Sequence, residues 1–167
     1  MNKCRGTFLI LSTLLILAGQ AEAAITTNFM KAVLEVKAGE ETAIKSTDGF
    51  KFTVINTSAE SKTGGVIELI PPEPESLVKD YEAIPDLGWL KLSKDTFALE
   101  PSAREEIEIT LTVPNDERYF EKKYQAYVWA YTTDAAVGLG VRSKILFTVH
   151  APGEENAVAP IERSAQT

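Results

Sequence analysis

Residues 124–133 alternate between two kinds of side chain and contain no glycine or proline. Aromatic and β-branched residues crowd the segment, which is typical of a β-strand. One face carries Tyr124, Ala126, Val128 and Ala130, and the other carries Gln125, Tyr127, Trp129 and Tyr131. The pattern therefore predicts a long strand, and the direction in which each face points decides what the strand can do.

The clearest alternation of apolar and polar residues lies at residues 105–113. Its even-numbered positions are charged or polar, and the odd-numbered positions expected to face inward are Ile107, Ile109, Leu111 and Val113. A last strand is predicted at residues 141–149, where Val141, Ser143, Ile145, Phe147 and Val149 share a face. Two glycines precede it, Gly138 and Gly140, which indicates a bulge or a close backbone contact there.

Shorter strands are predicted in the first half of the chain. Residues 31–37 are expected to form an edge strand, and residues 50–56 a clearer one. In the second of these, Phe50, Phe52 and Val54 share a face that we expect to be buried.

The segment between these strands and the middle of the chain is rich in turn-forming residues. Residues 56–65 are polar and end in two glycines, which predicts a loop before a strand at residues 66–70. Three prolines within residues 71–74 exclude a helix or a central strand there. Residues 76–86 fit a short helical turn and a covering loop equally well, and short strands are expected at residues 89–92 and 97–99.

The sum of these elements is seven or eight short strands, with turns about every ten residues and no predicted helix. This arrangement is typical of an all-β protein, and we interpret it as an immunoglobulin-like antiparallel β-sandwich.

The first 23 residues are predicted to be a signal peptide rather than part of the fold. Lys3 and Arg5 precede an apolar run at residues 8–18, and Ala21-Glu22-Ala23 resembles a cleavage site. The apolar run is shorter than the ~20 residues that span a bilayer, so we expect no membrane span after cleavage. The domain is then expected at residues 24–151, followed by a disordered polar tail at residues 152–167.

Charge and cysteine content narrow the classes of partner. The formal net charge is −7, and without residues 1–23 there would be 15 basic and 23 acidic residues. No cluster of Lys and Arg is present to bind a phosphate backbone, so we expect no nucleic-acid partner. The single cysteine, Cys4, lies in the predicted signal peptide, and the exported domain would depend on its apolar core without a disulfide.

Candidate catalytic and metal-binding residues are few. The only histidine, His150, ends the last predicted strand, and no nucleophile motif accompanies it. One histidine and no cysteine in the exported chain argue against a zinc site, and the acidic groups at residues 80–86 and 115–117 lack the spacing of a calcium loop. We therefore expect a non-enzymatic protein without a cofactor or metal.

From Trp89 onward the chain resembles exported bacterial immunoglobulin-like domains, the group that includes the pilus-chaperone-like and major-sperm-protein-like sandwiches. The resemblance covers residues 89–149 and implies a fold rather than an activity. Pilus chaperones also have a second domain and a basic cleft that grips the C-terminus of a subunit, and we expect no room for that domain in this chain. The residues that carry the resemblance are Trp89, Leu92, Phe97, Pro101, Ile107, Pro114, Tyr119, Tyr124 and Tyr127, with residues 144–149.

The resemblance implies that Tyr124 begins its strand as a corner tyrosine, with Ala126, Val128 and Ala130 continuing inward. Tyr127, Trp129 and Tyr131 would then form an outward stripe suited to a sugar ring or a protein partner. Two alternatives remain open: the aromatic residues could form the core with the alanines in solvent, or residues 76–86 or a neighbouring subunit could cover the stripe.

The function that we predict is binding, in an exported module of the cell envelope or the extracellular space, periplasmic or at the cell surface. The binding residues are predicted to be Tyr127, Trp129 and Tyr131, or else a sheet edge such as residues 31–37 that a second chain completes. The partner is expected to be a protein or a further copy of the chain, with a glycan possible. The alternative is a periplasmic chaperone-like assembly factor for secreted or pilus-type subunits, and a degradative enzyme is the third choice.

Overall fold

The computed structural model describes residues 25–133 and 139–153. The predicted signal peptide lies outside the described residues, as do Gly138 and all of the predicted tail after Gly153. The domain boundaries proposed from the sequence therefore remain predictions.

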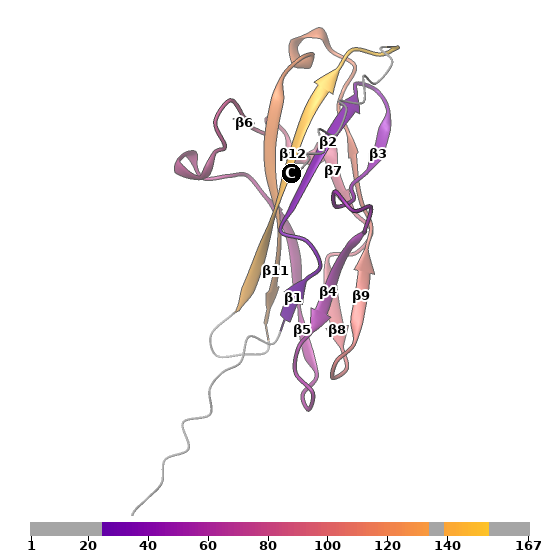
Figure 1. Ribbon diagram of the computed structural model, residues 1–167, viewed down its shortest axis with the longest axis vertical. Helices are drawn as coiled ribbons and strands as arrows, with labels where there is room; N and C mark the ends of the chain where they lie inside the picture. Colours follow the sequence, from indigo (N-terminus) through magenta and orange to yellow (C-terminus); the bar gives the residue numbers. More distant parts are fainter. Residues whose placement is uncertain (1–24, 134–138, 154–167) are drawn as a thin grey trace, which may run out of the picture.

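The largest sheet contains the aromatic strand at its centre. Its strands, in order across the sheet, are β2 (Lys31–Lys37), β12 (Gly140–His150), β11 (Lys123–Thr132), β5 (Thr63–Ile70) and β8 (Thr96–Leu99). The segment that links β5 to β7 contains β6 (Glu82–Ala83), which pairs with β11 beside this row. Figure 1 shows β11 and β12 running side by side along the long axis of the molecule.

Two short sheets form the opposite layer. One contains β1 (Ile25–Thr27), β4 (Phe52–Asn56) and β9 (Arg104–Ile107), and the other contains β3 (Glu41–Ala43), β10 (Ile109–Thr112) and β7 (Leu90–Leu92). Only Glu108 separates β9 from β10, so the predicted strand at residues 105–113 is divided where it passes from one short sheet to the other.

A single apolar core holds the layers together. The short sheets contribute Phe52, Ile107, Ile109 and Leu111, and the large sheet contributes Ala126, Val128, Ile145 and Phe147, all of them fully buried. The inward positions predicted in residues 105–113 are therefore correct, and the face shared by Ser143, Ile145, Phe147 and Val149 is the one that is buried. Three 3₁₀ turns complete the described structure: η1 (Pro74–Ser76), η2 (Leu87–Trp89) and η3 (Glu117–Tyr119). The all-β sandwich expected from the sequence is confirmed.

Two local expectations were wrong. Phe50, expected in the core beside Phe52, is 61% exposed, because it belongs to a tight turn in which the Ser46 N–H donates to the Phe50 carbonyl. Gly64 and Gly65, expected in a loop, lie within β5, where Gly65 pairs with Thr132 of β11 and with Phe97 of β8.

The chain crosses between the layers directly after β1. β1 pairs antiparallel with β4, whereas β2 pairs parallel with β12, so the sandwich is not purely antiparallel as expected. Asn28 ties this crossover to β4, because its backbone and side chain bond to the backbone of Lys51 and Thr53. The result places β2 at the edge of the large sheet, as the sequence predicted for residues 31–37.

Candidate functional site

The inner face of β11 is the alanine face. Ala126, Val128 and Ala130 are fully buried in the core, so the alternative that placed the alanines in solvent is wrong. Tyr124 is buried as well, and its ring packs edge-on against Trp89 with centroids 5.7 Å apart. The side chains of Gln125, Tyr127, Trp129 and Tyr131 therefore lie on the outer face of the large sheet.

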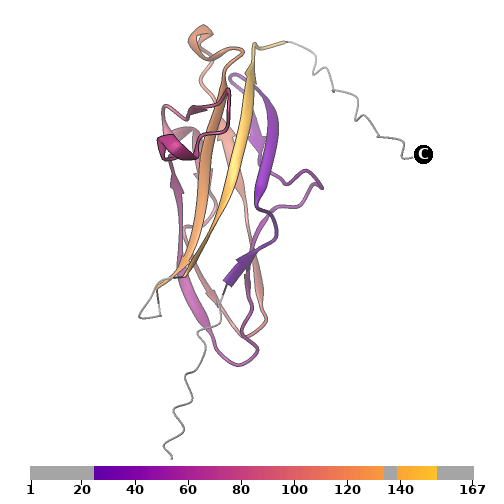
Figure 2. The same ribbon diagram turned by 60° about the vertical axis from the view of Figure 1, so that its left-hand side comes forward.

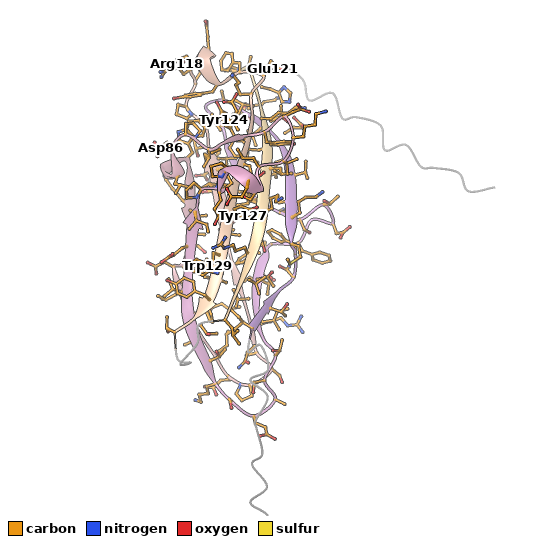
Figure 3. All side chains as sticks on the ribbon, turned by 90° about the vertical axis from the view of Figure 1, so that its left-hand side faces the viewer. Asp86, Arg118, Glu121, Tyr124, Tyr127 and Trp129 are labelled. Carbon is orange, nitrogen blue, oxygen red and sulfur yellow. The ribbon has the colours of Figure 1, made fainter. Side chains whose placement is uncertain are left out.

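A covering segment, residues 71–86, lies across one half of this outer face (Figures 2 and 3). The buried Gln125 side chain fastens the segment, because its Oε1 accepts from the Val78 N–H at 2.9 Å and its Nε2 donates to the Ser76 carbonyl at 3.1 Å. The same Nε2 donates to the Tyr127 hydroxyl at 3.2 Å. Tyr127 is consequently buried, and a ligand on the surface would not reach its ring face.

Trp129 and Tyr131 are half-buried and form the remaining part of the predicted stripe. Their ring centroids lie 4.3 Å apart with a tilt of 32°, and the Arg142 guanidinium lies 5.2 Å from the Trp129 ring. Arg142 in turn donates to Glu73 of the covering segment at 2.9 Å. In Figure 3 the labelled Trp129 stands at one side of this face, below the covering segment.

Carboxylates accompany the aromatic pair. The Tyr131 hydroxyl donates to Glu68 at 2.8 Å, and this hydrogen bond to a carboxylate raises the pKa of the Tyr131 phenol above its usual value. Arg142 bonds to Glu73, and the pKa of the Glu73 carboxyl is lowered by backbone hydrogen bonding and by that guanidinium. Two aromatic rings with hydrogen-bonding groups beside them can contact a planar or amphipathic ligand.

The outer edge of β2 is a second candidate site. The Lys144 N–H donates to the Met30 carbonyl and the Ala38 N–H donates to the His150 carbonyl, so the even-numbered residues of β2 bond to β12. In a parallel ladder the odd-numbered residues then direct their N–H and C=O groups away from β12. For Lys31, Val33 and Glu35 these groups lie on an edge that no strand of the described residues covers.

His150 holds the far end of β2 to β12. Its Nε2 lies 2.6 Å from Glu35 of β2, and its Nδ1 lies 3.3 Å from Glu121. The hydrogen bond to Glu35 raises the pKa of His150 above its ordinary value, burial opposes this, and Glu121 adds to the increase. The geometry gives the histidine a structural role, in which it joins β2 to the turn before β11.

A pH dependence follows from this cluster. Because the folded pKa of His150 is raised, its stabilisation is fully present below the unfolded pKa of about 6.5 and is lost as the pH rises through the folded value. Urea unfolding at pH 5.5 and pH 8.5 should show wild type losing stability relative to His150→Gln as the pH rises. A difference between the two proteins that is independent of pH would contradict the assignment.

Metal ligands do not gather in the part of the chain that the structure describes, where no group of three or more His, Cys, Asp or Glu side chains is placed to hold an ion. Among the same residues, no helix has the length and apolar character needed to cross a membrane.

Solved structures similar to this chain share its fold at low sequence identity. The ASH / PapD-like domain of human CEP192 gives a TM-score of 0.57 at 7% identity, over 87% of this chain and 99% of that one. The class 5 fimbriae chaperone CfaA gives 0.50 at 14% identity, over 75% of this chain and 56% of that one. A candidate carbohydrate-binding protein from Bacteroides ovatus gives 0.53 at 15% identity, over 74% of this chain and 36% of that one.

These similarities confirm the resemblance to PapD-like and immunoglobulin-like sandwiches at the level of the fold. The chain spans just over half the length of the fimbrial chaperone. No protein-family model matches the sequence, and no curated protein matches it.

Several residues of the two candidate sites were not singled out from the sequence. Arg142, Glu68 and Glu73 join the aromatic pair from β12, β5 and the covering segment, and Asn28 fastens the crossover before β2. Alternation places Arg142 on the outer face of its strand, but only the register between β11 and β12 brings it opposite Trp129.

Proposed function

We propose that the protein is an exported, non-enzymatic interaction module that binds an extended segment of another protein by strand addition to β2. The observation that carries the proposal is the row of outward N–H and C=O groups on Lys31, Val33 and Glu35. An unpaired strand edge offers main-chain hydrogen bonds to any extended chain of suitable side chains. The predicted signal peptide supports export, and the fold supports a binding role without defining the partner.

Strand addition predicts a specific effect of proline at this edge. Val33→Pro removes an outward N–H and leaves the bonds to β12 in place, and edge strands tolerate proline at such positions. Peptides of nine residues can be selected on wild-type protein from a displayed random library. They should bind Val33→Pro at least about tenfold more weakly, since the peptide loses the hydrogen bond from the Val33 N–H and can no longer approach the strand closely there.

Val33→Thr is the matched control, because it keeps the N–H and a β-branched side chain of nearly the same size. Its affinity for the selected peptides should stay within about twofold of wild type. Peptides that bind wild type and Val33→Pro equally well would show that the edge is not the site. Thermal unfolding of both variants separates loss of binding from loss of fold.

The alternative function, a periplasmic chaperone-like assembly factor, is supported by the fold similarity to the fimbriae chaperone CfaA. It would use the same edge for transient contact with unfolded chains. Such a protein should slow the aggregation of a chemically unfolded exported protein, and Val33→Pro should do so less well. A stable interaction module would instead give long-lived complexes and no such protection.

The aromatic pair Trp129 and Tyr131 is a second candidate surface, and we propose a glycan as its ligand. The stacked rings and the neighbouring carboxylates Glu68 and Glu73 favour a pyranose ring, which offers an apolar face and hydroxyl groups. Tyr127, predicted to belong to this surface, lies beneath the covering segment and would contribute support rather than contact. Trp129→Ala should abolish binding on a glycan array while the protein stays folded; retained binding would exclude the pair.

A further inference from the structure

The exposed large apolar side chains of the described residues are Met30, Val33 and Phe50, with exposed fractions of 64%, 45% and 61%. Val33 lies near the beginning of β2, and Met30 directly precedes this strand. Phe50 ends the turn between β3 and β4. Large apolar side chains scattered singly need no explanation, but a group of them marks an interaction site.

A hydrogen bond joins the end of the turn to the segment just before β2. Within the turn, the Ser46 hydroxyl accepts from the Phe50 N–H at 3.1 Å. The next residue, Lys51, accepts from Asn28 Nδ2 at 2.6 Å, and Asn28 is two residues from Met30. Figure 2 shows this turn projecting from the molecule near the start of β2.

Basic residues lie in the same two segments as these apolar side chains, and β2 also carries the exposed Glu35. Lys31 precedes Val33 on β2, and Lys45 and Lys51 flank the turn; all three are exposed. None of them forms an ion pair within the described residues. Asp48 at the tip of the turn is the one carboxylate of residues 44–51. The formal net charge of the whole chain is −7, so this basic and apolar area contrasts with the rest.

From this juxtaposition we infer that the edge of β2 recognises an extended segment of another protein that carries carboxylates next to apolar side chains. The inference rests on the proposed strand addition and names the chemistry of the segment. Side chains of an added strand alternate between two directions. Those on one side would contact Met30 and Phe50, and the acidic side chains would lie within reach of the three lysines.

The peptides selected on wild-type protein test this chemistry directly. We expect the sequences to be enriched in Asp and Glu next to apolar residues. The variant Lys31→Glu/Lys45→Glu/Lys51→Glu should bind a selected peptide at least about tenfold more weakly, because the reversal of charge turns three attractive pairs into repulsive ones.

A second triple variant, Lys79→Glu/Lys91→Glu/Lys123→Glu, is the matched control. It carries the same change of net charge on exposed lysines that lie elsewhere and form no ion pair in the described residues. Its affinity should stay within about threefold of wild type, since distant charges are screened at physiological salt.

The outcomes separate the inference from the proposed function. Peptides that depend on the Val33 N–H but show no acidic enrichment, or that lose affinity equally in both triple variants, would overturn the inference and leave strand addition intact. A library that yields no peptide sensitive to Val33→Pro would overturn both. Sedimentation that shows wild type as a dimer and Val33→Pro as a monomer would identify a second copy of the chain as the occupant, and would also overturn the inference.

Discussion

Gly65→Ala is expected to lower the free energy of unfolding by about 3 kcal/mol, the upper part of the range for overpacked sites. A Cβ at Gly65 would overlap the Tyr131 carbonyl oxygen and would lie 2.5 Å from the Phe97 ring. Because the obstacle is backbone of the adjacent strand β11, β5 could accommodate the methyl group only by moving away. A domain of this size is stable by ~5–15 kcal/mol, so the loss is a large fraction. Urea unfolding measures it.

The backbone clash also predicts which second change would fail to help. Gly65→Ala/Phe97→Leu should recover little stability, because removal of the ring leaves the carbonyl oxygen where it was. Gly140→Ala is the comparison, since its Cβ would meet the Trp129 indole and, at 2.8 Å, the Tyr131 Cβ. The Trp129 indole can turn aside, and the fixed atoms, the Tyr131 Cβ and the Ala130 carbonyl oxygen at 3.0 Å, are farther from the new methyl group than the Tyr131 oxygen is at Gly65. We therefore expect a smaller loss of about 1 kcal/mol. Equal losses for Gly65→Ala and Gly140→Ala would contradict this account.

Gln125→Leu is expected to lower the free energy of unfolding by about 2 kcal/mol and to loosen the covering segment, although leucine has a similar size and is apolar. The substitution leaves the Val78 N–H and the Ser76 carbonyl without their partner, and a polar group left unsatisfied in a partly buried place costs ~1–3 kcal/mol. The measurements are urea unfolding and amide hydrogen exchange, in which the Val78 amide should exchange faster than in wild type.

Tyr127→Phe serves as the control for Gln125→Leu. It removes only the hydrogen bond between Gln125 and the Tyr127 hydroxyl and keeps the two bonds from Gln125 to the covering segment. The free energy of unfolding should fall by about 1 kcal/mol. Exchange at Val78 should remain close to wild type. If Gln125→Leu left the Val78 amide as protected as before, the covering segment would have to be held by its other contacts, such as the Glu73–Arg142 ion pair.

The sequence predicted the strands well where one face is apolar and the other polar. Residues 105–113 have their inward positions correctly assigned, and the residues that share a face in 141–149 are correctly grouped, because alternation is a local property that burial of one face produces directly. The error at Phe50 has the same origin. The alternation extends back beyond the start of β4 into the preceding turn, and nothing in the residue types shows that the strand begins only at Phe52.

The outer face of β11 could not be predicted in the same way. Both of its faces are largely buried, so its pattern of residues allowed three orientations. The answer depends on Gln125, whose hydrogen bonds reach residues nearly fifty positions away, to Ser76 and Val78. Such contacts arise from the register between strands and from the path of a long connection, and neither leaves a periodic signal in the sequence.

Buried polar residues also have roles that composition does not reveal. Asn56 lies in a sequence that resembles a glycosylation motif, but its side chain is buried and its Nδ2 donates to the carbonyls of Ser61 and Glu100. The amide therefore organises the loop after β4 and is not available to carry a glycan. Only the three-dimensional arrangement distinguishes these two roles.

The parallel pairing of β2 with β12 also has a mechanical consequence. The two strands lie side by side over seven residue pairs, from Lys31 with Lys144 to Lys37 with His150. Tension that enters ahead of β2 and leaves after β12 would pull them along their length in opposite directions. All of the hydrogen bonds between them would then bear the load together in shear, rather than opening one after another, and a partner strand on the outer edge of β2 would share that load.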